Sequence, residues 1–129
     1  MEQKIAKRNS IVLIRYPFTD LTGAKVRPAV VVTPDHLLNK LDDILCIFIS
    51  SAIPEELLPT DFVLKPEHPS FTKTGLKHQS VFRTHKLALL NKSLVLRNLG
   101  EVEKNTMNEI DNRLTIALGL SEKSEGICC

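Results

Sequence analysis

Arg27 stands at the start of a strongly apolar run, "VRPAVVVT" at residues 26–33, and Ser50 and Ser51 end a second run, "ILCIFISS" at 44–51. An unpaired guanidinium is costly to bury, so Arg27 needs a partner or water. A planar guanidinium beside hydroxyl donors suits an oxyanion or a phosphodiester. If the two runs are neighbouring antiparallel strands, Arg27 and Ser50 meet at one rim. The alternatives are a surface ion pair for Arg27 and an ordinary strand end for the serines.

Other kinds of catalytic site have little support in this sequence. The four histidines show no metal-ligand spacing with one another or with a cysteine; they are His36, His68, His78 and His85. The chain has no glycine-rich phosphate loop after a strand, no Gly-x-Ser-x-Gly turn and no acidic cluster of the kind that holds two magnesium ions. We therefore expect neither a metal nor a cofactor, and a standard hydrolase, kinase or metallonuclease is disfavoured.

The basic residues are unevenly distributed, although the net charge is only +2. Residues 1–30 contain six lysines and arginines against two acids, and residues 68–100 contain six against none. If both segments share a face, that face attracts a polyanion such as nucleic acid. The alternative is a solvated surface with uneven charge.

Some of the aromatic side chains are placed to contact unpaired bases. Tyr16, Phe18 and Phe71 lie at or near expected loops, where they can stack on single-stranded nucleic acid. Ordinary packing at a strand end is the alternative for Tyr16 and Phe18. The remaining phenylalanines are assigned to the core; they are Phe48, Phe62 and Phe82.

The length of 129 residues predicts a single domain over residues 1–120, followed by a frayed tail at 121–129. No stretch of about 18 apolar residues predicts a membrane span, and the N-terminus lacks the apolar core of a signal peptide. Cys46 lies in an apolar run and is expected to be a buried thiol. Cys128 and Cys129 are adjacent, which suits neither a disulfide framework nor a zinc site. A cytoplasmic protein is expected.

These residues must be positioned by short strands, expected at 10–18, 26–33, 44–51, 61–65, 79–88 and 96–102. The continuous apolar run at 26–33 predicts a strand covered on both faces. Thr33 as N-cap and Pro34 predict a short helix at 35–40. Apolar residues at three- and four-residue steps predict an amphipathic helix at 104–118, ended by Gly119. The fold class is mainly β, a β-barrel with helices: closely spaced strands of this kind curl into a small barrel or a strongly bent sheet, and the terminal helix covers an open side.

Four segments resemble the MazF/PemK family of toxins from type II toxin–antitoxin systems. They are "IVLIRYPFTD" at 11–20, "RPAVVVTP" at 27–34, "IFISS" at 47–51, and "SVFRTHKLALLNKSLVLRNLGEVEKNTMNEIDNRLTIALGL" at 80–120. The resemblance spans roughly residues 10–120. Their order along the chain makes the set far more specific than "RPAVVV" alone.

The resemblance implies an SH3-like barrel with a C-terminal helix, forming a homodimer. It implies a metal-independent endoribonuclease that acts on single-stranded RNA and is blocked by a cognate antitoxin. The catalytic arginine and the catalytic hydroxyl fall on Arg27 and Ser50, with Ser51 beside the latter. The substrate-binding residues that we associate with this site are Ser51, Tyr16, Phe18, Thr19, Lys25, Arg83 and His85.

The chain also departs from the family pattern. Ser80 and Val81 stand where many members have an Asp-Gln pair, and His85 stands where an acidic residue is common. Neither Arg27 nor Ser50 suits the role of general base, because arginine stays protonated and serine is not basic; His78 or His85 is a candidate. A different hypothesis is a non-catalytic barrel that binds nucleic acid or, like the gyrase-poisoning toxins, a protein target.

Overall fold

The computed structural model describes residues 7–17 and 24–120. Phe18, Thr19 and the tail at 121–129 lie outside the described residues. The strands are β1 (Ser10–Pro17), β2 (Ala24–Val31), β3 (Asp43–Ser50), β4 (Asp61–Leu64), β5 (Ser80–Asn91) and β6 (Val95–Glu101). The helices are α1 (Asp35–Leu38), α2 (Lys104–Ala117) and the 3-10 turns η1 (Thr72–Thr74) and η2 (Lys92–Leu94). Each strand expected from the sequence is present, with small changes at its ends.

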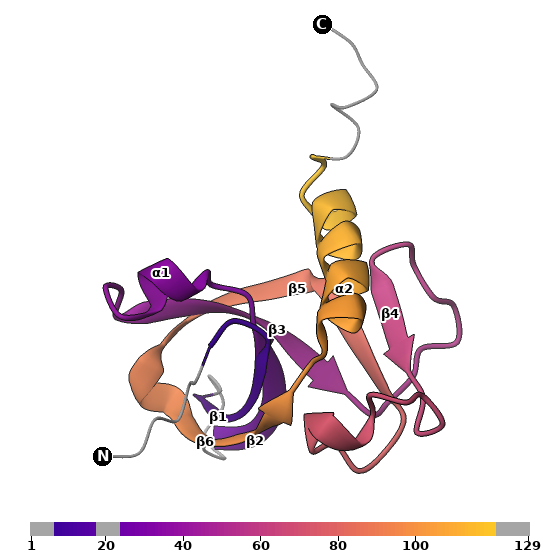
Figure 1. The fold of residues 1–129 in the computed structure, drawn as a ribbon, viewed down its shortest axis with the longest axis horizontal. Helices are drawn as coiled ribbons and strands as arrows, with labels where there is room; N and C mark the ends of the chain where they lie inside the picture. Colours follow the sequence, from indigo (N-terminus) through magenta and orange to yellow (C-terminus); the bar gives the residue numbers. More distant parts are fainter. Residues whose placement is uncertain (1–6, 18–23, 121–129) are drawn as a thin grey trace, which may run out of the picture.

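All the strands belong to one antiparallel, strongly bent sheet with the order β4-β5-β3-β2-β1-β6. The long strand β5 begins beside β4 and then continues along β3, so it connects the two ends of the structure (Figure 1). β1, β2 and β6 curl around one side (Figure 1). The expectation of a mainly β, SH3-like small barrel with a C-terminal helix is confirmed.

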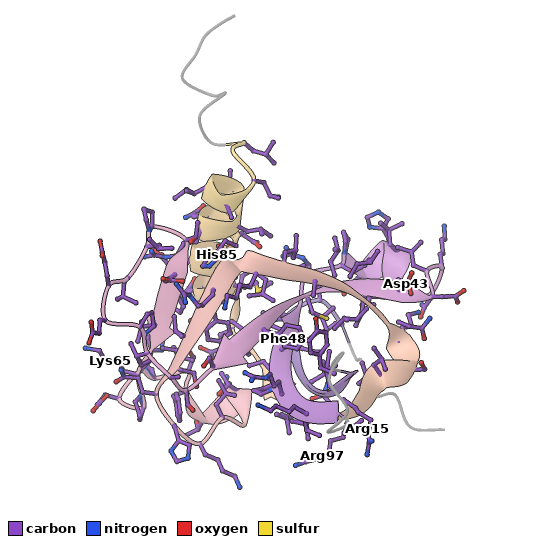
Figure 2. All side chains as sticks on the ribbon, turned by 180° about the vertical axis from the view of Figure 1, so that it is seen from behind. Arg15, Asp43, Phe48, Lys65, His85 and Arg97 are labelled. Carbon is purple, nitrogen blue, oxygen red and sulfur yellow. The ribbon has the colours of Figure 1, made fainter. Side chains whose placement is uncertain are left out.

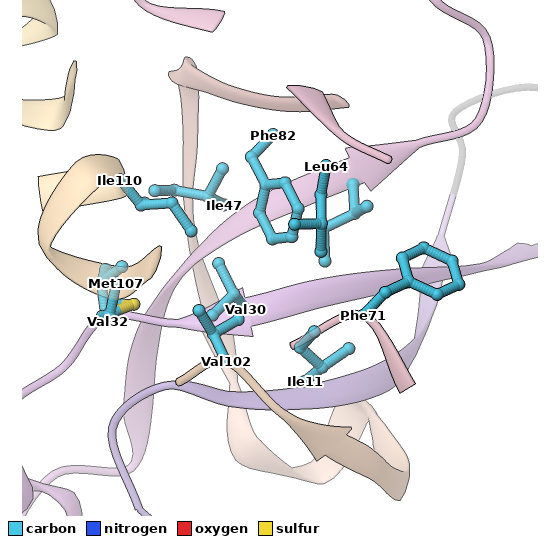
Figure 3. Close-up of a cluster of buried hydrophobic side chains, with 11 residues drawn as sticks. Ile11, Val30, Val32, Ile47, Leu64, Phe71, Phe82, Val102, Met107 and Ile110 are labelled. Carbon is cyan, nitrogen blue, oxygen red and sulfur yellow. The ribbon is translucent and has the colours of Figure 1, made fainter. Parts of the chain in front are cut away.

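The curl of the sheet gives β2 a buried environment on both faces, as its continuous apolar run predicts. Val30 and Val32 pack into a cluster with Ile47 and Phe82, part of which Figure 3 shows. Ala29 and Val31 instead face a second cluster with residues of β1 and β3. β-branched side chains suit such a strand, because they pack well on a pleated surface. The two faces of β2 therefore hold the two halves of the core together.

α2 covers the open side of the sheet, as its apolar periodicity predicts. Met107 and Ile110 are buried in the same cluster as Val30 and Phe82, and the helix stands beside β4 and β5 (Figure 1). On its wet side Glu109 and Arg113 form the expected pair, with 3.7 Å between Oε1 and Nη2. Gly119 has a φ of 75°, the left-handed conformation that ends a helix. Among the described residues, no helix is long and apolar enough to cross a membrane.

Three local expectations are wrong. Thr33 does not cap α1: its side chain is buried and its Oγ1 accepts a hydrogen bond from the Leu45 N–H on β3, at 2.8 Å. Pro34 occupies the N-cap position instead, and the helix ends earlier than predicted, at Leu38. Phe71 is not available for base stacking, because it is only 7% exposed and belongs to the core.

Candidate active site

Strand pairing brings Arg27 and Ser50 to the same rim of the sheet. β2 and β3 are antiparallel neighbours, with Ala29 opposite Phe48 and Val30 opposite Ile47. This register, continued by two residues along each strand, places Arg27 opposite Ser50. The start of β2 therefore meets the end of β3, as the sequence analysis required for an anion site.

A hollow of about 390 Å³ opens at this rim. Arg27 and Lys25 line it from β2, Ser50 and Ser51 line it from the end of β3, and Lys77 lies on the segment that leads into β5. The remaining lining residues are Val26, Pro28, Ile49, Leu76, His78 and Ser80. Cations and hydroxyl groups thus surround a space in which no described carboxylate lies.

Arg27 also borders a second hollow of about 360 Å³. Tyr16 and Phe48 form one part of its wall, with their ring centroids 5.1 Å apart in an edge-to-face arrangement. Lys86, Leu87 and Ala88 from β5 form the rest. An apolar, aromatic surface therefore lies next to the cationic one, and Arg27 stands between them.

The Arg27 guanidinium is half-buried and makes no hydrogen bond or ion pair with any residue that the structure describes. The surface ion pair considered for it is thus not found within residues 7–17 and 24–120. The Ser50 Oγ accepts a hydrogen bond from the Ala52 N–H at 3.0 Å, which fixes the hydroxyl in place. Because the Oγ acts as acceptor in that bond, its own hydrogen remains available to donate.

The other predicted site residues divide into two groups. Tyr16, Lys25 and Ser51 lie at the two hollows, together with Arg27 and Ser50. Arg83 and His85 line neither hollow; they lie on β5 between Ser80 and Lys86, and Figure 2 shows His85 close to α2. Their assignment to substrate binding stays a prediction.

Arg83 has a clear structural partner in the buried Asp61 of β4. Its Nε donates to Asp61 Oδ1 at 2.9 Å and its Nη2 to Oδ2 at 3.3 Å. Burial by itself raises the pKa of the Asp61 carboxyl. The hydrogen bonds from Arg83 and the Leu58 N–H, with the nearby charges of Arg83 and His85, outweigh burial and hold that pKa below its usual value. His85 Nδ1 lies 2.9 Å from the Thr60 Oγ1.

Sequence reasoning missed three residues that line the hollows. Phe48 packs against the second core cluster, as predicted, but it is only partly buried and also borders the second hollow against Tyr16. Lys77 and Lys86 were counted as part of a basic segment, without a place in the site. The available signal was this segment itself: when β5 pairs with β3, its charges are brought toward the rim that holds Arg27.

The described residues contain no group of three or more His, Cys, Asp or Glu side chains placed to hold a metal ion.

A bent antiparallel sheet with a terminal helix forms a small β-barrel, and its second and third strands build a cationic rim. Residues 7–118 match the family described as the PemK-like, MazF-like toxin of type II toxin–antitoxin systems. This match covers most of the 129 residues. The chain therefore belongs to that family.

Solved structures of similar fold support the architecture. A mycobacterial endoribonuclease in complex with its cognate antitoxin is 24% identical, with a TM-score of 0.65 over 88% of this chain and 95% of that one. A second mycobacterial endoribonuclease is 22% identical, with a TM-score of 0.67 over 93% and 97%. MazE–MazF from Deinococcus radiodurans gives 19% identity and a TM-score of 0.69 over 90% and 98%. At these identities the likeness concerns the fold.

Proposed function

We propose that this toxin is a metal-independent endoribonuclease that cleaves single-stranded RNA, including mRNA, at the rim between β2 and β3. The observation that carries the proposal is the half-buried Arg27 guanidinium, which has no partner among the described residues and stands between a cationic hollow and an aromatic one. Because the guanidinium faces both hollows, its N–H donors are available to an anion that enters either one. A phosphodiester with bases on either side is the ligand that fits both hollows.

The proposed reaction is internal transfer within the RNA. The 2′-oxygen attacks the adjacent phosphorus, the bond to the 5′-oxygen breaks, and the products carry a 2′,3′-cyclic phosphate and a 5′-hydroxyl. Negative charge grows on the non-bridging oxygens in the transition state. Arg27 supplies a two-pronged donor for them, and Ser50 supplies a neutral hydroxyl donor.

The remaining residues of the two hollows bind the chain around the scissile phosphate. Lys25, Lys77 and Lys86 surround it with positive charge for the neighbouring phosphates. Tyr16 and Phe48 provide a surface on which an unpaired base stacks. Ser51 is a second hydroxyl near the phosphate. This division separates phosphate contacts, which supply affinity, from base contacts, which supply sequence preference.

We also propose that the toxin forms a homodimer in the cytoplasm and is blocked by a cognate antitoxin. The similar mycobacterial endoribonuclease was solved with its antitoxin. Leu45 and Leu89 are register partners on β3 and β5, yet they expose 38% and 64% of their surface. Neighbouring exposed leucines favour a protein contact. A monomer in light scattering at micromolar concentration would contradict the dimer.

The test is cleavage of a long single-stranded RNA in EDTA by the wild type, Arg27→Ala and Arg27→Lys, with Arg97→Ala as a matched control. Arg97 is exposed and lines neither hollow. We expect discrete fragments with 5′-hydroxyl ends from the wild type and the control. Loss of one transition-state donor costs about a hundredfold or more in rate, so Arg27→Ala is nearly inactive. Arg27→Lys keeps the charge but loses the fork, so it remains strongly impaired.

Intact RNA in every reaction would refute nuclease activity and favour the non-catalytic binding module, which predicts a salt-sensitive complex without a cut product. Equal cleavage by the wild type and Arg27→Ala would show that the assignment of Arg27 is wrong.

A further inference from the structure

The proposed cleavage needs a group that takes the proton from the 2′-hydroxyl, and neither Arg27 nor Ser50 can do so. Among the described residues that line the cationic hollow, the ionisable ones are Lys25, Arg27, Lys77 and His78. Lysine and arginine side chains are protonated at neutral pH, and serine hydroxyls are not basic. An imidazole is the one group of this set that offers a free nitrogen lone pair near neutrality.

His78 is exposed at the edge of the hollow, but the chain that carries it is fixed on both sides. On one side, the Ser80 Oγ donates a hydrogen bond to the His78 carbonyl oxygen at 2.7 Å, and Ser80 itself is buried. On the other side, the Leu76 N–H donates to the buried Thr74 Oγ1 at 3.1 Å. His78 therefore sits between two anchored residues rather than in a free loop.

The turn before His78 packs directly against β6. Gly75 has a φ of 75°, and a Cβ at this position would lie 2.1 Å from the Leu99 carbonyl oxygen. A Cβ on Gly100 would lie 2.3 Å from the Lys73 carbonyl oxygen. Backbone therefore touches backbone with no space for a side chain between them. This contact holds one wall of the hollow at a defined place opposite β2 and β3.

We propose that His78 is the general base of the cleavage reaction, an inference that rests on the proposed nuclease function. A neutral ring nitrogen of His78 takes the 2′-hydroxyl proton as the O2′–P bond forms. The P–O5′ bond breaks, the 5′-oxygen takes a proton from water, and the imidazolium returns its proton to water. Charge and atoms balance without any other reactant.

The charged groups that face this imidazole are cations. Lys25 and Arg27 face the hollow from β2 and Lys77 from the same segment as His78, whereas β3 contributes only the hydroxyls of Ser50 and Ser51. The three cations bind the phosphate, and the imidazole handles the proton. Phosphate binding and proton transfer thereby fall to different side chains.

The experiment is single-turnover cleavage of a short RNA with one mapped site, from pH 5 to pH 8.5, by wild type, His78→Ala and His78→Gln. His36→Ala is the matched control, because His36 is another exposed histidine and lines neither hollow. Circular dichroism verifies that each variant is folded. General bases contribute about 10²- to 10⁴-fold, so we expect both His78 variants to be at least a hundredfold slower. The wild-type rate should fall as the solution becomes acidic, because a protonated imidazole cannot act as a base, and both His78 variants should lack this fall.

A substrate with sulfur in place of the bridging 5′-oxygen separates a base from an acid, because a thiolate leaves without protonation. We expect His78→Ala to remain slow on it. Recovery of the wild-type rate on this substrate would overturn the assignment, since His78 would then act as the acid.

Two other results would overturn it. One is cleavage by His78→Ala within threefold of the wild type; the other is a slow variant that keeps the same acidic fall in rate. In both cases Arg27-dependent cleavage would leave the proposed nuclease function standing. Cleavage that is absent in the wild type, or equal in Arg27→Ala, would instead remove the proposed function and this inference with it.

Discussion

The ion pair between Asp61 and Arg83 should stabilise the fold at the corner of β4 and β5, and Asp61→Asn tests this. The Asp61 side chain is fully buried, whereas Arg83 is 23% exposed. Removing one partner of a buried pair costs about 3–5 kcal/mol. Asparagine still offers one acceptor oxygen, and Arg83 keeps access to water. We therefore expect Asp61→Asn to lower the free energy of unfolding by about 2–3 kcal/mol, below the full cost.

The matched control is Asp111→Asn. Asp111 pairs with Arg8 in a similar two-pronged geometry, at 2.8 and 3.1 Å, but their side chains are 36% and 31% exposed. Exposed pairs contribute at most about 1 kcal/mol. Urea unfolding followed by circular dichroism, at one fixed protein concentration, measures both changes; the concentration matters because assembly adds to apparent stability.

The same pair predicts a dependence on pH. Because the pKa of Asp61 is lower in the folded protein than in the unfolded chain, where it is near 3.9, its contribution is complete above about pH 5. It is lost as the pH falls through the folded value. The stability difference between the wild type and Asp61→Asn should therefore shrink on acidification below about pH 4.

Equal losses of unfolding free energy for Asp61→Asn and Asp111→Asn would refute this reasoning, since burial would then make no difference.

The Asp61–Arg83 pair also bears on the site, because Arg83 is a predicted substrate-binding residue. If its role is only structural, Arg83→Gln lowers stability but leaves the cleavage rate of the folded protein unchanged. A weaker affinity for RNA in folded Arg83→Gln would instead support the original assignment.

Three further outcomes are expected. Gly75→Ala should destabilise the protein by at least about 2 kcal/mol more than Gly119→Ala in urea unfolding. Both glycines have a φ of 75°, but only a Cβ on Gly75 would meet a backbone oxygen. The difference between the two variants therefore measures this steric clash. Burial raises the pKa of the Cys46 thiol to about 12, so in a variant lacking the two C-terminal cysteines a thiol reagent at pH 8 should react only when the fold opens. Ser50→Ala should slow RNA cleavage about a hundredfold in the EDTA assay, whereas Ser50→Thr, which keeps the hydroxyl, should stay within a few-fold of the wild type.

The parts of the fold that the sequence predicts best are those fixed by local pattern. The unbroken apolar run of β2 requires cover on both faces, and the curled sheet provides it through Val30 on one face and Val31 on the other. The three- and four-residue spacing of α2 places Met107 and Ile110 on the core. Neither prediction requires knowledge of a distant partner, because each follows from the residue's own neighbours.

The parts that could not be predicted depend on pairings between distant residues. Thr33 is a good N-cap by type, but a hydrogen-bond donor on β3 takes up its hydroxyl. Phe71 lies in a polar segment, yet it is buried in the core cluster beside residues from distant strands. From the sequence, the cation at Arg83 is predicted to be available for RNA. In the structure, Asp61, twenty-two residues away, pairs with it. In each case a local role and a distant partner compete for the same side chain. The local sequence pattern does not show which of the two prevails.

The same competition explains why charge counting gave only a weak indication of the site. A basic segment contributes to a polyanion site only with those cations that no internal carboxylate has already paired. Arg8 is engaged by Asp111 and Arg83 by Asp61. Arg27, by contrast, has no partner among the described residues, and Lys77 and Lys86 come from the second basic segment to the same two hollows. The fold thus separates cations that stabilise it from cations that face a ligand, and this separation points to the rim at Arg27.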